Sequence, residues 1–291
     1  MKIHNSIIFF SLLVSPVILL RLIVSIYPNF STLYLSFTNT DLLERTNDLV
    51  GLKNYFKFYF NPNSIKILSF SIIFVFLSTF MQVSIGFLIA LLLNINSKIK
   101  NLLRTISLIP WAVPMIVVGY TFSWLLNDQF GLINLFNPFW DEKPLIFLSP
   151  TASQITVILV NIWKTMPFVA ILLLAGLQGV QSELIDASKV DGANNFQVTK
   201  YIIIPAILPL AIVISILLLV SQFGNFDVIF AMTQGGPGVS TQILALQIFN
   251  DGMLFFKFGY AAAESVILLI FVIIISLIGT SIYSLVLKKY A

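Results

Sequence analysis

Six long apolar segments are the feature that most limits what this chain can fold into. They cover about residues 6–27, 65–93, 105–126, 153–177, 206–227 and 260–287. A helix needs about 20 consecutive apolar residues to cross the hydrocarbon core of a bilayer, and each segment is long enough to do so with some tilt. The segments are continuous, whereas membrane-spanning β-strands alternate apolar and polar residues. The sequence therefore predicts an all-α integral membrane protein, with six transmembrane helices in a single transmembrane domain over residues 1–291.

The first apolar segment differs from a secretory signal peptide in two ways. The run from Ile7 to Tyr27 is longer than the apolar core of a signal peptide, and no small-x-small cleavage site follows it. We therefore expect this segment to remain as an uncleaved first transmembrane helix.

The composition agrees with a membrane protein and excludes several other classes. Charged residues make up 10% of the chain, against about 25% in soluble domains, and the net charge of +4 is too small and scattered to indicate nucleic-acid binding. The chain has no cysteine, and its one histidine is His4, which argues against a metal site or histidine acid–base chemistry. The sequence also contains no Walker A loop, nucleophile elbow or His-Glu-x-x-His motif. We therefore expect a protein that is not an enzyme.

The positions of lysine and arginine favour cytoplasmic N- and C-termini. In that orientation eight basic residues face the cytoplasm and six face outside, in longer loops, as the positive-inside rule requires. The tight cluster from Lys98 to Arg104 is the clearest indicator. Residues 28–64 then form an extracytoplasmic loop, and residues 178–205 form a cytoplasmic loop.

The cytoplasmic loop carries the most specific motif of the chain. It reads Glu183-Leu-Ile-Asp-Ala-Ser-Lys-Val-Asp-Gly-Ala193, followed by Ile202, Pro205 and Pro209. This pattern resembles the EAA loop of ABC importer permeases, Glu-Ala-Ala-x-x-Asp-Gly-Ala followed by an isoleucine and a proline. Asp186 replaces the glutamate and Ser188 replaces the second alanine, whereas the Asp-Gly-Ala core and the proline spacing are intact.

Further segments resemble the same family in the same order along the chain. They are Val50–Tyr55, Arg104–Pro114, Asn161–Phe168, Ala175–Gln178, Thr233–Pro237 and Gly259–Val266. The Gly-Gly-Pro element is typical of the maltose/glycerol-phosphate-type first permease. One such segment is a modest signal, but the ordered set covers nearly the whole chain and is specific.

The resemblance implies the fold and partners of a binding-protein-dependent importer. It implies the six-helix fold of type I ABC importer permeases, in the cytoplasmic (inner) membrane of a bacterium. The implied partners are a second, homologous permease subunit, two ATPase subunits and an extracytoplasmic solute-binding protein. This chain would hold no cofactor, because the ATPase subunits would bind ATP and Mg²⁺. The implied cargo is a sugar or sugar-like solute.

The resemblance also implies that the EAA segment docks on an ATPase subunit. The residues expected to take part are Glu183, Asp186, Ala187, Ser188, Asp191, Gly192, Ala193 and Pro205. The residue pattern by itself also fits an ordinary capped helix in a loop, with Gly192 as its C-terminal cap.

A second group of residues is expected to line the solute path. In maltose-type relatives the fourth span and the end of the fifth contribute to the sugar site, and the matching residues here are Asn161, Lys164, Thr165, Phe168, Gln222 and Asn225. Other roles stay open. Lys164 could instead be a structural lysine paired within the heterodimer, and Gln222 and Asn225 could make hydrogen bonds between helices.

Two other functions remain as alternatives. A stand-alone secondary transporter or channel would carry intramembrane acidic residues or inverted repeats, but nearly all acidic residues here lie in loops or at span ends. The chain could also be a structural subunit whose sister holds the whole solute site.

Overall fold

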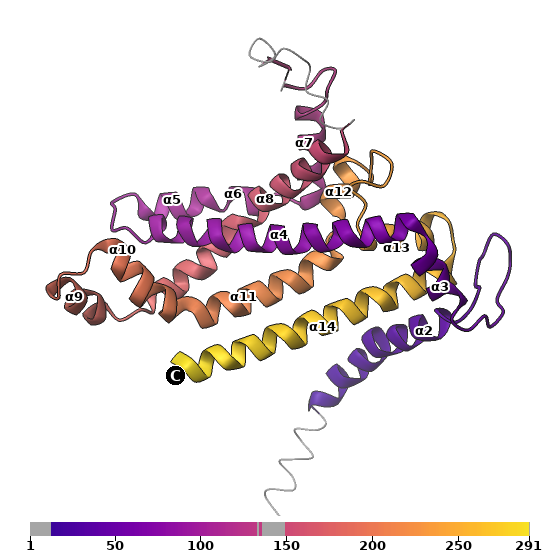
Figure 1. Ribbon diagram of the computed structural model, residues 1–291, viewed down its shortest axis with the longest axis horizontal. Coiled ribbons are helices and arrows are strands. Elements are labelled where there is room, and N and C mark those ends of the chain that lie inside the picture. Colours follow the sequence, from indigo (N-terminus) through magenta and orange to yellow (C-terminus); the bar gives the residue numbers. More distant parts are fainter. Residues whose placement is uncertain (1–12, 133, 136–148, 291) are drawn as a thin grey trace, which may run out of the picture. The chain divides into compact units, whose positions relative to one another are not determined.

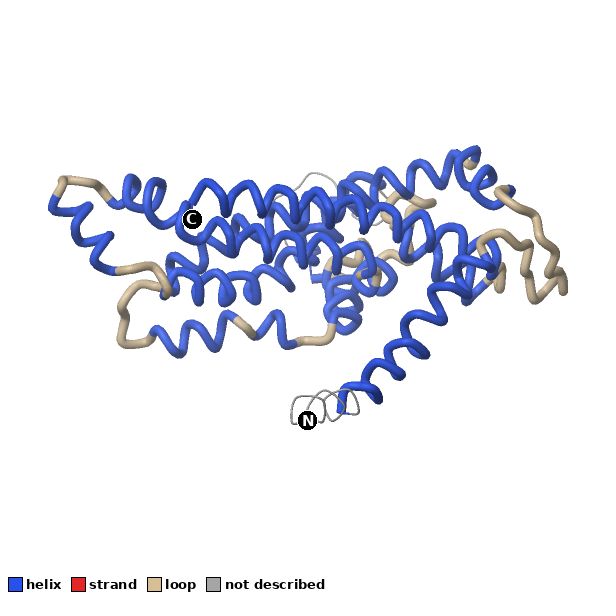
Figure 2. The backbone as a smooth tube through the Cα atoms, turned by 90° about the horizontal axis from the view of Figure 1, so that it is seen from below, coloured by secondary structure: helices blue, strands red, loops and turns tan. Residues whose placement is uncertain are grey.

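A computed structural model describes residues 13–132, 134–135 and 149–290. The start of the first expected span, residues 6–12, and His4 lie outside these ranges. Among the described residues, five helices are long and apolar enough to cross a membrane, and a bent helix pair makes a sixth if its two halves are counted as one span. Figures 1 and 2 show a backbone built from helices joined by loops. The described chain is therefore an all-α membrane protein, as the sequence predicted.

The chain divides into two compact units. The first comprises residues up to Asn61 together with Gln247–Leu269, and the second comprises Pro62–Leu246 together with Ile270–Ala291. The long helix α14, Phe258–Tyr290, contributes to both units.

The first unit begins with one long helix. It runs over Leu13–Leu35 and includes the π-helical turn η1, Leu22–Ile26, followed by α2, Tyr27–Leu35. The sequence predicted an end at Tyr27, before Pro28. The helix continues past Pro28, which lies in the first turn of α2 directly after the π-helical turn.

An ordered loop and the short helix α3, Lys53–Phe60, complete the N-terminal part of this unit. Asn54 lies at the centre of the loop, because its side-chain amide donates to the carbonyls of Ser36, at 3.0 Å, and Thr38, at 2.7 Å. The N–H of Gly259 donates to the Thr40 carbonyl at 2.9 Å. A Cβ at Gly259 would collide with the Thr38 carbonyl, so glycine permits this close approach. The π-helical turn η4, Asn250–Leu254, precedes α14 in this unit.

Helices α4, Pro62–Leu93, and α8, Pro150–Gln178, form the centre of the second unit, with α11, Ile204–Gly224, packed against both. Their shared core contains Ala90, Leu93, Val169, Leu173, Leu177, Ile207 and Ile214. A Cβ at Gly86 would lie 3.0 Å from Val169 Cγ1 and 3.2 Å from the Ala170 nitrogen. Gly86 therefore lets α4 and α8 approach closely, as small residues do in membrane helix pairs.

The third expected span, residues 105–126, is divided into separate helices. The structure has α5, Lys100–Ser107, α6, Ile109–Ala112, and α7, Met115–Leu125, with a bend of 84° between Lys100–Ala112 and Met115–Leu125. Val113 is extended, with φ −73° and ψ 134°, and Pro114 has no N–H to continue the helix. The helix is therefore interrupted at the step from Val113 to Pro114.

Short helices follow α8 and α11. The segment after α8 contains α9, Ser182–Val190, α10, Asn195–Val198, and the π-helical turn η3, Thr199–Ile203, which leads into α11. The fifth span ends at Gly224 rather than at Asp227, and Asp227 instead begins α12, Asp227–Met232, which packs against α7. Helix α13, Leu244–Phe249, follows the Gly-Gly-Pro loop.

Candidate functional site

Three buried amide side chains connect the central helices of the second unit. The Gln82 side chain of α4 donates to the main-chain carbonyl of Asn161 in α8 at 3.3 Å. The Asn161 side chain donates to Gln222 Oε1 of α11 at 3.1 Å, and the Gln222 side chain donates to Gln82 Oε1 at 3.3 Å. The exposed fractions are 0% for Gln82 and Asn161 and 2% for Gln222. We call Gln82, Asn161 and Gln222 the amide ring. It ties three spans together by hydrogen bonds in an apolar medium, while the buried Asn161 Oδ1 has no hydrogen-bond partner among the described residues.

Lys164 lies one turn further along α8 and contacts the broken third span. Its side chain is 8% exposed, and its Nζ donates to the Trp111 main-chain carbonyl of α6 at 2.5 Å. The same ammonium group lies 5.7 Å from the centre of the Trp111 ring. The Phe168 ring stacks on Trp111 with centroids 4.7 Å apart and planes at 9°. Trp111 keeps 43% of its surface exposed, so the stacked pair offers a flat apolar surface beside polar groups.

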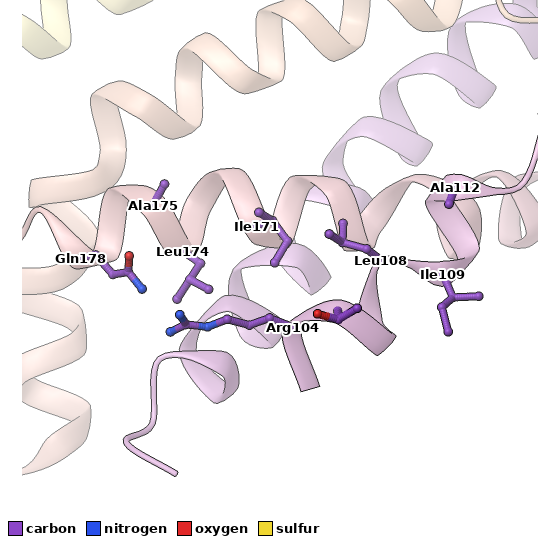
Figure 3. Close-up of a pocket in the computed structure, with 9 residues that line it drawn as sticks. Arg104, Leu108, Ile109, Ala112, Ile171, Leu174, Ala175 and Gln178 are labelled. Carbon is purple, nitrogen blue, oxygen red and sulfur yellow. The ribbon is translucent and has the colours of Figure 1, made fainter. Parts of the chain in front are cut away.

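A pocket of about 600 Å³ continues along the same face of α8 toward its C-terminal end. Figure 3 shows Arg104 of α5 extending along it toward the end of α8 where Leu174 and Gln178 lie. Arg104 donates to the carbonyl of Leu93, the last residue of α4, at 3.2 Å. A cation there is favourable because the carbonyl end of a helix carries partial negative charge.

The segment after α8 presents an exposed helix with a fixed C-terminal end. Helix α9 has no buried residue, and Val190 is 89% exposed. The helix ends in a Schellman motif, because the Ala193 N–H donates to the Ser188 carbonyl at 2.9 Å and the Gly192 N–H to the Lys189 carbonyl at 3.0 Å. Gly192 has φ +88°, a conformation that glycine adopts readily and other residues do not. The sequence predicted this cap.

Beyond that cap, the chain is fixed to the next span. Asn194 forms a capping box with Gln197 at the start of α10, which satisfies two main-chain donors. Helix α10, η3 and α11 follow one another as one continuous helix, Asn195–Gly224, with Pro205 in the first turn of α11. The exposed helix α9 is therefore joined to a membrane span through short, regular elements.

The first unit holds a separate polar cluster. Gln247 donates to Glu264 Oε1 at 2.5 Å, and both side chains are buried. Asp251 lies in the π-helical turn before α14, and burial raises its pKa, while Lys257, a hydrogen bond from Gln247, and Lys57 oppose that rise. No partner for Glu264 could be predicted from the sequence, and the structure supplies Gln247. Among the described residues, no group of three or more histidine, cysteine, aspartate or glutamate side chains is placed to hold a metal ion.

With this geometry established, the family follows from comparison with known proteins. Residues 82–290 match the family described as the binding-protein-dependent transport system inner membrane component. The chain belongs to this family. This result confirms the resemblance found in the sequence and identifies the chain as a membrane-spanning permease component of a binding-protein-dependent ABC importer.

Individual relatives cover nearly the whole permease. The chain is 32% identical over 271 residues to the trehalose/maltose transport system permease protein MalF of Thermococcus litoralis, covering 91% of this chain and 89% of that protein. It is 30% identical over 259 residues to the sulfoquinovosyl glycerol transport system permease protein SmoG of Agrobacterium fabrum, covering 88% of this chain and 84% of the relative.

A solved structure supports the fold. A chain of a bacterial alginate ABC transporter, crystallised with an alginate pentasaccharide-bound periplasmic protein, superposes with a TM-score of 0.82. The match has 18% sequence identity and covers 96% of this chain and 94% of that one. At this identity the likeness concerns the fold alone, and it confirms the predicted fold of ABC importer permeases.

The structure brings together most of the permease residues that the sequence singled out for a solute path. Asn161 and Gln222 bond to each other, and Lys164 and Phe168 meet at Trp111. Thr165 and Asn225 are both half-buried, and Asn225 is the C-cap of α11. Sequence reasoning missed Gln82 and assigned Trp111 no site role. An amide within a long apolar segment, and an aromatic residue between Pro110 and Pro114, were the available signals.

Proposed function

We propose that this permease forms half of a translocation path for a sugar or sugar-like solute, driven by a separate ATPase. The observation that carries the proposal is α9, an exposed helix that lies within the family's EAA-like segment and is fixed at its C-terminal end. The names of the two relatives, which are permeases for trehalose/maltose and for sulfoquinovosyl glycerol, support a sugar-like cargo.

The 178–205 loop is the proposed contact with the ATPase. Ala187 and Ser188 are small residues in α9, which suits a helix that must approach a partner surface closely, and Glu183, Asp186 and Asp191 supply charge. Gly192 and Ala193 fix the end of α9, and Pro205 lies where the connected segment enters α11. Movement of α9 on ATP binding would then pass into α11 as rigid-body motion, because short packed elements transmit displacement without bending.

The solute path is proposed to follow the exposed face of α8. Sugars need hydrogen bonds to their hydroxyl groups and a flat apolar surface for the ring. The Trp111–Phe168 stack offers the flat surface, and Thr165 of α8 and Asn225 at the end of α11 offer polar groups. Asn161, Gln222 and Lys164 bond to protein groups, and we propose that they shape the wall of the path.

The remaining partners are proposed from the family. A second permease subunit would supply the other half of the path, and two ATPase subunits would bind ATP and Mg²⁺. An extracytoplasmic solute-binding protein would deliver the cargo. The N- and C-termini would face the cytoplasm, with the ordered loop of the first unit outside.

Co-purification in mild detergent tests the ATPase contact. We expect the tagged permease to retain a second permease and an ATPase, with ATP hydrolysis in the eluate, and we expect Gly192→Pro to lose the ATPase. Proline cannot adopt φ +88°. The matched control is Gly51→Pro, because Gly51 also has a positive φ, of +59°, and, like Gly192, has no neighbouring atom within 4 Å of where a Cβ would lie.

Two results would contradict the proposal. One is a chain that purifies alone from membranes in which its partners are expressed. The other is equal loss of the ATPase in Gly51→Pro and Gly192→Pro, because that would trace the loss to general misfolding rather than to α9.

A further inference from the structure

The break in the third span leaves main-chain carbonyl groups without their usual donors. In a continuous helix each carbonyl accepts from the N–H four residues later, so Pro110 would need residue 114 and Trp111 would need residue 115. Residue 114 is a proline without an N–H, and Val113 is extended. The C-terminal end of α6 therefore presents orphan carbonyls within a membrane span, where each unsatisfied group is costly.

Lys164 supplies one of the missing donors. Its Nζ donates to the Trp111 carbonyl, and the side chain is 8% exposed. A lysine at mid-span is costly unless a partner offsets its charge. Among the described residues no carboxylate forms an ion pair with Lys164. The main-chain carbonyl of Trp111 is therefore the hydrogen-bond partner of the Lys164 ammonium group.

A second cationic side chain of this protein also donates to a carbonyl at the C-terminal end of a helix. Arg104 donates to the carbonyl of Leu93, at the C-terminal end of α4. In both cases a cation from one helix meets the carbonyl end of another, where the helix dipole favours positive charge.

We propose that Lys164 is a positioning residue that caps the C-terminal end of α6 and holds the 84° bend between Lys100–Ala112 and Met115–Leu125. Its role is to fix the main chain at Trp111 from α8, and it makes no direct bond to the solute.

The cap also affects the proposed solute path, and this step rests on the proposed function. Trp111 carries both the capped carbonyl and the ring that stacks on Phe168. Phe168 is one turn from Lys164 on α8, so the two residues hold Trp111 at its main chain and at its ring. Loss of the cap would free the orientation of the stacked pair and weaken solute binding without removing any group that touches solute.

A distance measurement tests the cap without depending on transport. The chain has no cysteine, so Leu102→Cys in α5 and Trp124→Cys in α7, both exposed, place a spin-label pair across the bend. Pulsed electron paramagnetic resonance would be recorded on the full chain in lipid nanodiscs with its co-purifying subunits. The preparation without added cysteines must first show no label uptake.

The proposal predicts a specific pattern among the variants. Lys164→Met should broaden the distance distribution and shift it to longer distances, because α6 and α7 are released toward a straighter path. Lys164→Arg keeps a donor and should restore the original distribution. Lys200→Met, which removes the same charge from an exposed position, should leave it unchanged. An unchanged distribution in Lys164→Met overturns the proposal.

A second variant keeps the test decisive if Lys164→Met does not assemble. Pro114→Ala restores an N–H at the break while Lys164 remains. The cap predicts that the bend persists in Pro114→Ala, whereas straightening of that variant overturns it.

Uptake measurements separate this inference from the proposed function. With the cap as described, Lys164→Met raises the solute concentration for half-maximal uptake severalfold, and Lys164→Arg recovers it. If Lys164 instead binds solute, uptake falls while the spin-label distances stay unchanged, which refutes the cap alone. If the chain is no importer subunit, uptake is absent in every variant, yet the distances still decide the cap.

Discussion

At the residue scale, polar side chains inside the spans of the second unit are bonded mainly to other parts of the protein. The amide ring joins α4, α8 and α11 through Gln82, Asn161 and Gln222, and Lys164 bonds to the Trp111 carbonyl. In a bilayer interior a polar group without a protein partner has no water with which to form a hydrogen bond. These bonds therefore specify which helix faces meet.

The amide ring predicts a coupled loss of stability. Gln222→Leu removes two of the three bonds and leaves Asn161 and Gln82 without those partners. We expect the free energy of unfolding, measured by denaturant titration in mixed micelles, to fall by about 1–3 kcal/mol. Gln82→Leu combined with Gln222→Leu should cost less than the sum of the single variants.

An exposed glutamine provides the control for the ring. Gln129→Leu changes the same residue type outside the helices and should alter stability by less than about 0.5 kcal/mol. Strict additivity of Gln82→Leu and Gln222→Leu would show that the two side chains do not interact.

The residues of the ring also show what could be read from the sequence. Asn161 and Gln222 were singled out because they match the segments that line the sugar site in maltose-type relatives, but the sequence could not say that they bond to each other. Gln82 went unassigned because which helix faces which is decided by packing across three spans. Lys164 stood out as a charge in a span, whereas its main-chain partner could not be predicted from residue types.

At the element scale, the third span works as two separate helices. The first half, α5 and α6, packs through α6 on α8, whereas α7 packs mainly on α12. The contact between α7 and α12 depends on Gly119, where an added Cβ would lie 2.5 Å from Ala231 Cβ and 3.2 Å from the Val228 carbonyl oxygen. The two halves are therefore attached to different partners on either side of the bend.

This close approach predicts the effect of a larger side chain. Gly119→Val should destabilise the protein by about 1–3 kcal/mol, the usual cost of overpacking, as measured by thermal unfolding in detergent. Adding Ala231→Gly should recover part of the loss, because it removes the nearest atom. Gly224→Val, at a position with open space, serves as the control, and an equal loss there would argue against a specific contact.

The elements could be predicted to different degrees. The long helices follow from apolar length, and the end of α9 follows from Gly192 and its neighbours. The break at Pro114 was visible as a proline but not as an 84° bend, because proline within membrane helices also produces mild kinks. The extension of the first helix past Pro28 depends on a π-helical turn that has no simple sequence signature.

At the scale of the whole molecule, the proposed orientation places α9 and the loop of the first unit on opposite sides of the membrane. The absence of cysteine makes this directly testable. A membrane-impermeant maleimide should label Glu44→Cys in intact spheroplasts and should label Val190→Cys only after permeabilisation. Both positions are exposed, and the chain without added cysteines is the control. Labelling of Val190→Cys in intact cells would reverse the orientation.

The most direct test of the central claim is uptake into proteoliposomes that contain the permease with its co-purified subunits. Radiolabelled trehalose, maltose and an anionic sugar would be offered with the solute-binding protein, with and without ATP inside. The account predicts uptake of a sugar-type solute only when ATP and the binding protein are both present, with loss of uptake in Gly192→Pro. Uptake by the purified chain alone, driven by an ion gradient without ATP, would contradict the account and establish a stand-alone secondary transporter.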